Sequence, residues 1–178
     1  MDLSYPIGRF VWDRDKPALT REERGHLIEQ IAAAPTRLRE AVSGLSPEQL
    51  DTPYRPEGWT VRQVAHHVPD SHINAYVRFK WSLTETDPAI KVYEESEWAK
   101  LEDATAAPVE TSLELLEALH RRWIVLLRSL EDRDFARTLR HPESGSMNLD
   151  HLLAMYAWHG RHHVAHITSL SDRMGWTR

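Results

Sequence analysis

Histidines gather in two short stretches of this sequence, and imidazole is a side chain that binds metals and moves protons near neutral pH. The stretch WHGRHHVAHI at residues 158–167 holds four of the eleven histidines: His159, His162, His163 and His166. The stretch VAHHVPDSH at residues 64–72 holds three more: His66, His67 and His72. The clusters are compatible with a shared metal site, with a pH switch, or with core histidines that each have a hydrogen-bond partner.

The composition limits which metal sites are possible. The chain contains no cysteine, which excludes disulfides, thiolate nucleophiles and cysteine-ligated zinc. A metal must therefore be held by histidine, aspartate or glutamate. Any thiol that a reaction requires must come from a cosubstrate.

Residues 148–174 have the periodicity of a long amphipathic helix. At 100° per residue its apolar side chains fall on one face: Leu149, Leu152, Tyr156, Ile167, Leu170 and Met174. His159 and His163 lie in the middle of this stripe, one turn apart, with His166 close beside them. His162 lies at the edge of the stripe. The helix therefore directs at least three imidazoles into the protein interior.

Three imidazoles together in a core favour a bound cation. Neutral rings need hydrogen-bond partners when they are buried, and protonated rings repel one another. The i, i+4 pair His159 and His163 also places two ring nitrogens within reach of one metal, as in HExxH helices. No glutamate occupies the HExxH position, so the mechanism of those zinc proteases is excluded.

The second cluster lies on a helix that the pattern predicts over residues 61–83, and its periodicity is ambiguous. His72 falls near the centre of one apolar face, His67 at the flank of that face, and His66 on roughly the opposite side. Pro69 disturbs the helical phase within this stretch. Periodicity alone slightly favours His72 over His67 as a third ligand.

Other polar residues have structural explanations that compete with functional ones. His120 lies on an apolar stripe and is expected in the core or in a pocket wall. Asp70, Asn74 and Arg78 share the helix of the first cluster and line a pocket or meet solvent. Three remaining histidines are expected in loops or at the surface: His26, His141 and His151.

The elements that must position these residues are helices. Long helices are predicted over residues 21–42, 61–83, 112–130 and 148–174, with Pro35 expected to kink or break the first. Residues 84–110 are expected to form an irregular crossover with one short helix near residues 94–101. The fold prediction is one all-α domain over residues 1–178, a four-helix bundle with a long crossover between its second and third helices. Such bundles build metal sites from facing helices.

Charge and hydropathy limit the partners. The net charge of −5 is spread along the chain, which argues against a nucleic-acid partner. No apolar run is long enough to span a membrane, and the first residues, MDLSYPIGRF, lack the pattern of a signal peptide. We therefore expect a cytoplasmic protein that binds neither nucleic acid nor membrane and acts on a small molecule.

Three blocks of the sequence carry a family resemblance: DTPYRPEGWTVRQVAHHVPDSH, YVRFKWSLTE and WHGRHHVAHI. Together they resemble the DinB superfamily, and within it the YfiT-like metal-dependent hydrolases, over nearly the whole chain from residues 3–8 to residues 173–176. The resemblance implies an up-and-down four-helix bundle, a homodimer, and one divalent metal per subunit held by three histidines. It assigns these ligands to His159, His163 and the histidine eight positions after Trp59, His67. This assignment replaces the preference for His72.

Three neutral imidazoles leave a metal with an open coordination position, which is typical of catalytic sites. Zn²⁺ is the default ion for three nitrogens, and Ni²⁺ is acceptable. An open position that activates water indicates a hydrolase, which is the function we predict. Asp70, His72 and His162 are the candidates for acid–base or supporting roles, and Arg78 is a candidate for binding a carboxylate.

Two alternatives remain open at this point. An open position that binds a thiolate would make the protein an S-transferase, moving a low-molecular-weight thiol such as bacillithiol onto an electrophile. The absence of an evident glutamate base beside the histidine pair favours this alternative. The other alternative is a non-catalytic metal-binding dimer, which would require four protein ligands and no pocket.

Overall fold

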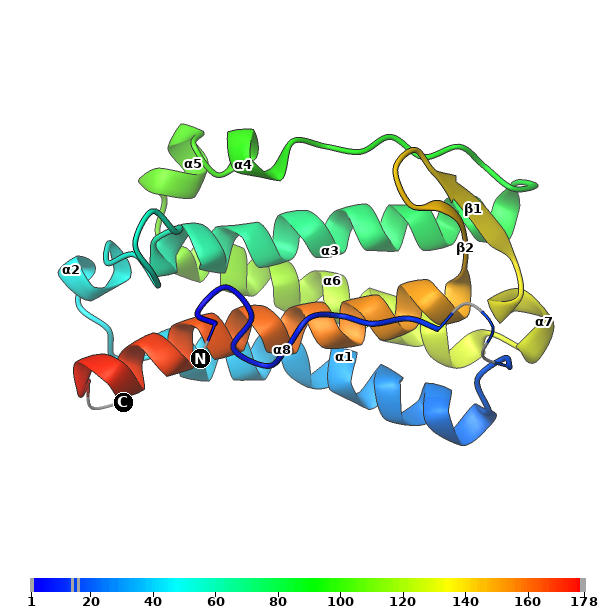
Figure 1. Cartoon of the computed structure of the whole chain (residues 1–178), viewed down its shortest axis with the longest axis horizontal. Helices are drawn as coiled ribbons and strands as arrows, with labels where there is room; N and C mark the ends of the chain where they lie inside the picture. Colours follow the sequence, from blue (N-terminus) through cyan, green and yellow to red (C-terminus); the bar gives the residue numbers. More distant parts are fainter. Residues whose placement is uncertain (1, 14, 16, 177–178) are drawn as a thin grey trace.

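Four long helices form the body of the protein (Figure 1). The computed structural model describes residues 2–13, 15 and 17–176. The long helices are α1 (Arg21–Val42), α3 (Val61–Thr84), α6 (Val109–Ser129) and α8 (Leu149–Met174). The predicted all-α four-helix bundle is therefore confirmed, with the second and third long helices joined by a long crossover.

The directions of the four long helices differ in one respect from a simple up-and-down bundle, in which successive helices are antiparallel. α1 and α3 both pack against α6 and α8, so α1 and α3 lie on a diagonal of the bundle. On α3 and α6, His66 contacts Ser112 and Phe79 contacts Trp123, so these two helices run in the same direction. The physical reason is the crossover, which returns along the length of the bundle before α6 begins (Figure 1).

Prolines inside the helices do not interrupt them. Of the two outcomes expected at Pro35, a kink or a break, the break does not occur, because α1 continues as one helix to Val42. Pro69 likewise lies within an unbroken α3. Both helices are stabilised at their N-termini, because Thr20 in α1 and Thr60 in α3 each form a capping box with the residue three positions later.

The connections contain more structure than the sequence indicated. The crossover holds two short helices, α4 (Glu95–Trp98) and α5 (Glu102–Thr105), instead of one. Two further short helices are α2 (Pro47–Leu50), which the sequence pattern SPEQL indicated, and α7 (Asp132–Phe135), which was not anticipated.

A β-hairpin that was not predicted precedes α8. Strands β1 (Thr138–His141) and β2 (Gly145–Asn148) pair antiparallel, and Gly145 has the positive φ of 74° that this tight connection needs. Each strand has four residues, too few for an alternating pattern to stand out in the sequence. The hairpin is bonded to the crossover, since the Ile90 amide donates to the Arg140 carbonyl.

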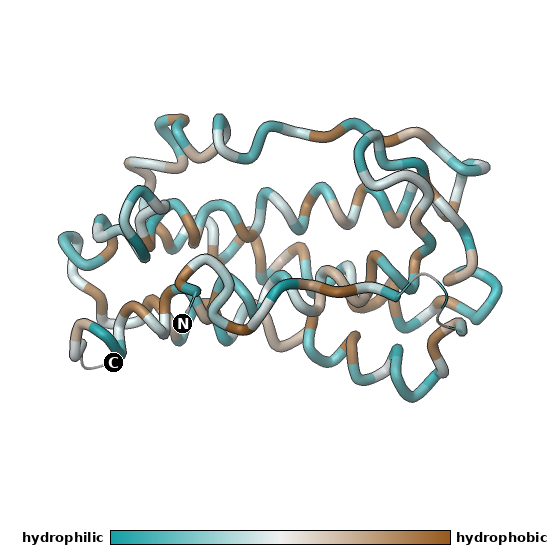
Figure 2. Tube along the Cα trace, viewed as in Figure 1, coloured by the Kyte–Doolittle hydropathy of each residue, from teal (hydrophilic) through white to brown (hydrophobic). Residues whose placement is uncertain are grey.

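The core consists of two apolar clusters, one toward each end of the bundle. Along α3, His72 lies between Val68 of one cluster and Ala75 of the other. Figure 2 shows the corresponding alternation of apolar and polar segments along each long helix. The histidines thus occupy the level of the bundle where one core ends and the next begins. In the part of the chain that the structure describes, no helix is both long and apolar enough to cross a membrane.

Candidate metal centre

Three histidines from two facing helices converge at the level of the bundle where the two apolar clusters meet. α3 contributes His67, and α8 contributes His159 and His163 from successive turns. One ring nitrogen from each lies within 4.8 Å of the other two. His67 Nε2 and His159 Nε2 are 3.3 Å apart. The residues that the resemblance assigned as ligands are therefore brought together.

The spacing of His67 and His159 fits a tetrahedral metal ion. With zinc–nitrogen distances of about 2.0–2.1 Å, two ligand nitrogens on a tetrahedron are separated by about 3.3–3.4 Å. The Nε2–Nε2 distance of 3.3 Å between His67 and His159 agrees with this value. His163 Nδ1 is buried and has no hydrogen-bond partner among the described residues, and such an orphaned atom calls for an explanation. The donor set, three imidazoles without a carboxylate, suits Zn²⁺ or Ni²⁺.

Burial keeps these rings in the neutral form that can bind a metal. Burial, assisted by the charges of His166 and His162, lowers the pKa of His67 to about 4. Burial is also the main reason that the pKa values of His159 and His163 lie well below 6.5, with neighbouring histidines acting in the same direction. The lone pairs are therefore available at neutral pH.

A chain of hydrogen bonds fixes the proton on His159. His120 Nδ1 lies 2.8 Å from the Ile31 carbonyl oxygen, which can only accept, so Nδ1 carries the proton and Nε2 of the neutral ring accepts. His72 Nδ1 lies 2.8 Å from that Nε2 and therefore donates. His72 Nε2 in turn accepts from His159 Nδ1 at 3.2 Å. This leaves the His159 Nε2 lone pair directed at His67.

Close helix packing makes this chain possible. Gly160 follows His159, and a Cβ atom at Gly160 would lie 3.1 Å from Ala34 Cβ on α1 and 3.6 Å from His72 Cε1. Because Gly160 lacks a side chain, α1 and α8 approach each other closely where the histidine chain crosses the bundle. The glycine inside WHGRHH thus has a packing role.

One side of the triad opens into a cavity of about 450 Å³, which we call the aromatic chamber. Its walls include Tyr5, Tyr54, Arg55, Trp59 and Trp158. The N-terminal segment lies along α8 (Figure 1), and its Ser4 and Tyr5 line this chamber. It is held by hydrogen bonds from His166 Nε2 to the Ser4 carbonyl at 3.2 Å and from Trp158 Nε1 to the Gly8 carbonyl at 3.2 Å.

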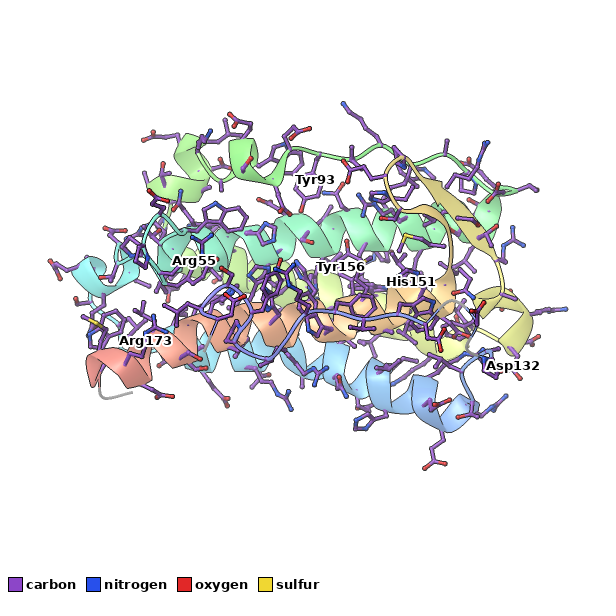
Figure 3. The ribbon with its side chains drawn as sticks, in the orientation of Figure 1. Arg55, Tyr93, Asp132, His151, Tyr156 and Arg173 are labelled. Atoms are coloured by element: carbon purple, nitrogen blue, oxygen red, sulfur yellow. The ribbon has the colours of Figure 1, made fainter. Side chains whose placement is uncertain are left out.

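The other side opens into a second cavity of about 460 Å³, which we call the crossover chamber. Ser71, Arg78, Tyr93 and Tyr156 line it; Figure 3 shows Tyr93 on the crossover and Tyr156 on α8. His159 lines both chambers, and so does Glu95 at the start of α4. The triad therefore lies where two cavities meet.

The three candidates for acid–base and supporting roles, His162, His72 and Asp70, lie in different environments. His162 lines the aromatic chamber and stacks on Trp158 with ring centroids 4.2 Å apart. His72 is fully buried behind His159 and reaches neither chamber. Asp70 lines neither chamber; burial and the charge of Asp103 raise its pKa to about 6. The structure thus does not bring Asp70 to the site.

Several residues at the site were missed by the sequence analysis. Ser71 Oγ lies 3.3 Å from His159 Nε2, and its position four residues after His67 is a signal that could have identified it. Tyr156 was assigned to the core stripe and lies at the boundary between core and crossover chamber. Glu95 comes from the crossover, whose position no helical period predicts.

Comparison with known proteins agrees with this architecture. A protein of Bacillus cereus (strain 03BB102) that bears the name "Putative metal-dependent hydrolase" is 52% identical over 175 residues, which cover 98% of this chain and 99% of the relative. A protein of Bacillus thuringiensis subsp. konkukian (strain 97-27) with the same name and a locus designation is also 52% identical over the same shares of the two chains.

Solved structures show the same fold. YfiT from Bacillus subtilis, described as "a probable metal-dependent hydrolase with an unusual four-helix bundle topology", superposes with a TM-score of 0.95 at 47% identity, over 99% of this chain and 100% of YfiT. TT2238, a four-helix bundle protein, superposes with a TM-score of 0.58 at 20% identity over 82% of this chain and 98% of its own. The family profile of the DinB superfamily matches residues 30–167. The chain therefore belongs to the DinB superfamily.

Proposed function

We propose that the protein is a metal-dependent hydrolase in which His67, His159 and His163 hold one divalent metal ion, Zn²⁺ by default. The observation that carries this proposal is the convergence of three neutral ring nitrogens within 4.8 Å of one another where two cavities meet. A divalent metal held by these residues supplies Lewis acidity and lowers the pKa of a bound water toward about 7. The names of the relatives support the same class of reaction.

Glu95 is the residue that we assign to proton transfer. It is the carboxylate that lines both chambers among the described residues, and although the residue is exposed on α4, desolvation by the surrounding protein raises its pKa above the ordinary value of 4.5. A raised pKa brings a carboxylate closer to the range in which a general base works best. Glu95 accepts the proton of the attacking water and returns it to the leaving group. This assignment removes the argument that the site lacks a glutamate base.

Thiol transfer is the second candidate, and one observation favours it. Two separate chambers meet at His159, an arrangement that suits a reaction of two substrates. A thiol would occupy one chamber and an electrophile the other. A purely structural metal site, in contrast, would need a fourth ligand and no cavity, and it is not supported by three nitrogens beside two chambers.

The test compares the two reactions on the same zinc-loaded protein. We expect hydrolysis of activated esters or amides that disappears when the metal is removed by a chelator. Glu95→Gln should lower kcat by about 100-fold without loss of zinc, whereas Glu97→Gln on the same exposed helix should not. Conjugation of 1-chloro-2,4-dinitrobenzene to small thiols, without any hydrolysis, would instead establish the transferase.

His120 offers a separate prediction on the tautomer of His159. His120→Phe keeps a ring of similar size but removes the acceptor of His72, so the proton on His159 Nδ1 is no longer enforced. Mutating the hydrogen-bond partners of metal-binding histidines typically lowers metal affinity by about 10- to 100-fold, and we expect a loss in that range. Competition with a chromophoric chelator measures it. The exposed His26→Phe should leave affinity unchanged, and a folded His120→Phe protein with wild-type affinity would contradict the prediction.

A further inference from the structure

Arg78 is a buried guanidinium that has no carboxylate partner among the described residues. Its exposed fraction is 6%. Its hydrogen bond to a side chain runs from NH1 to the Tyr156 hydroxyl at 3.5 Å, and no ion pair among the described residues involves it. Buried charges in proteins are normally paired, because an unpaired charge loses its hydration without compensation. The charge of Arg78 therefore calls for an anion.

Arg24 in the same bundle shows the usual arrangement. Its exposed fraction is 4%, and it bonds Asp150 at 2.6 Å and Asp132 at 2.6 Å. The two arginines are buried to a similar degree, yet Arg24 is fully paired within the protein. The difference is that Arg78 lines the crossover chamber, which gives a ligand access to it.

We infer that the crossover chamber binds a substrate carboxylate through Arg78, with the rest of the substrate directed at the histidine triad. The inference rests on the proposed function and adds a substrate class to it. The planar guanidinium matches a carboxylate with two parallel hydrogen bonds. The hydroxyls of Tyr93 and Tyr156 belong to the same chamber and can donate to the anion.

The charge around the chamber selects the kind of anion. Glu94, Glu95 and Glu143 line the same cavity, so its one buried cation is surrounded by acidic groups. These carboxylates repel any anion, and the repulsion grows with the charge of the ligand, so beside the single cation Arg78 they favour a monoanionic carboxylate over a phosphate dianion. The ligand class is therefore a small organic monocarboxylate.

The position of Arg78 relative to the triad orients the substrate. Arg78 contacts the Tyr156 hydroxyl, and the Tyr156 ring centroid lies 5.6 Å from that of His159. His159 also lines the crossover chamber. A carboxylate on Arg78 thus places the remainder of a short molecule along Tyr156, with its reactive group toward His159.

The experiment measures anion binding to the metal-free protein, so it does not depend on catalysis. Butyrate is titrated into ¹⁵N-labelled protein, with butyramide as the neutral isostere and inorganic phosphate as the competing anion. We expect butyrate, and not butyramide, to shift the Arg78 side-chain signal. Arg78→Gln should weaken butyrate binding by about 10-fold or more, and Arg78→Lys should weaken it less. Lys80→Gln removes a surface charge from the same helix and should change nothing.

The outcomes separate this inference from the proposed function. His163→Ala should retain butyrate binding while losing metal, so failure of the metal site leaves the carboxylate site measurable. Equal butyrate affinity in wild type and Arg78→Gln overturns the inference, as does tighter Arg78-dependent binding of phosphate. If Arg78→Gln does not fold, the butyrate-dependent shift in wild type and the weakened Arg78→Lys decide the question.

Discussion

Replacing His163 by alanine should lower zinc affinity by more than about 1,000-fold. The substitution removes one of three converging nitrogens and leaves His67 and His159 as a two-ligand site. Removing a hydrogen-bond partner of a metal ligand lowers metal affinity by about 10- to 100-fold, so removing a ligand itself should lower the affinity by more than that. Competition with a chromophoric chelator gives the affinity, and metal analysis after dialysis gives the stoichiometry, expected to fall from one ion per chain to none.

His162 provides the matched control for this substitution. It is the neighbouring residue on α8, its exposed fraction of 6% is close to the 7% of His163, and it also has a buried Nδ1 without a partner. It is not part of the triad. His162→Ala should therefore change zinc affinity by less than about 10-fold. Equal losses in the two variants would mean that the metal is held by a different set of histidines.

Helical periodicity predicted the buried residues of the site better than it predicted the candidate ligands. His72 is fully buried, as its place at the centre of an apolar face indicated, and α3 continues unbroken through Pro69. The deepest residue of a stripe, however, has no route to a substrate. His67 lies at the flank of the face and lines the aromatic chamber. Periodicity measures burial, whereas a catalytic site needs a position at the edge of the core.

The chambers could not be predicted, because they depend on connections rather than helices. Glu95 and Tyr93 reach the site from the crossover, and Tyr5 reaches it from the N-terminal segment. These segments have no helical periodicity in their sequence, and their positions depend on contacts with residues far away in the chain. The resemblance supplied His67 through a spacing from Trp59, whose ring centroid lies 4.7 Å from that of His67. The homodimer, the metal and the cellular location stay predictions.

The metal-free protein should lose most of its stability between pH 7.5 and pH 5. Burial lowers the pKa of His67, His120 and His162 to about 4, from an ordinary value of 6.5. Below pH 6.5 the unfolded chain therefore binds protons that the folded protein does not, and stability falls as pH falls through this window. Each histidine contributes about 2 kcal/mol to the loss at pH 5.

Two groups act in the opposite direction, since the pKa values of Asp70 and Glu95 are both raised by desolvation in the folded protein, and the larger effect must be included. The pKa of Asp70 is raised to about 6, so the folded protein binds this proton more tightly and gains about 1 kcal/mol at pH 5. The three histidines together outweigh it, and the net loss of about 5 kcal/mol is comparable to the whole stability of many domains. Urea unfolding followed by circular dichroism at pH 7.5 and pH 5, with a chelator present, measures the difference.

His120→Phe tests the cause of this acid sensitivity. Without the imidazole at position 120, the difference in unfolding free energy between the two pH values should shrink by about 2 kcal/mol, whatever the variant's stability at pH 7.5. His26→Phe replaces an exposed ring and should leave the difference unchanged. Zinc should shift the unfolding midpoint to lower pH, because it binds neutral imidazoles and only in the folded state. Equal stability of the wild type at both pH values would show that its buried histidines are not held neutral by the fold.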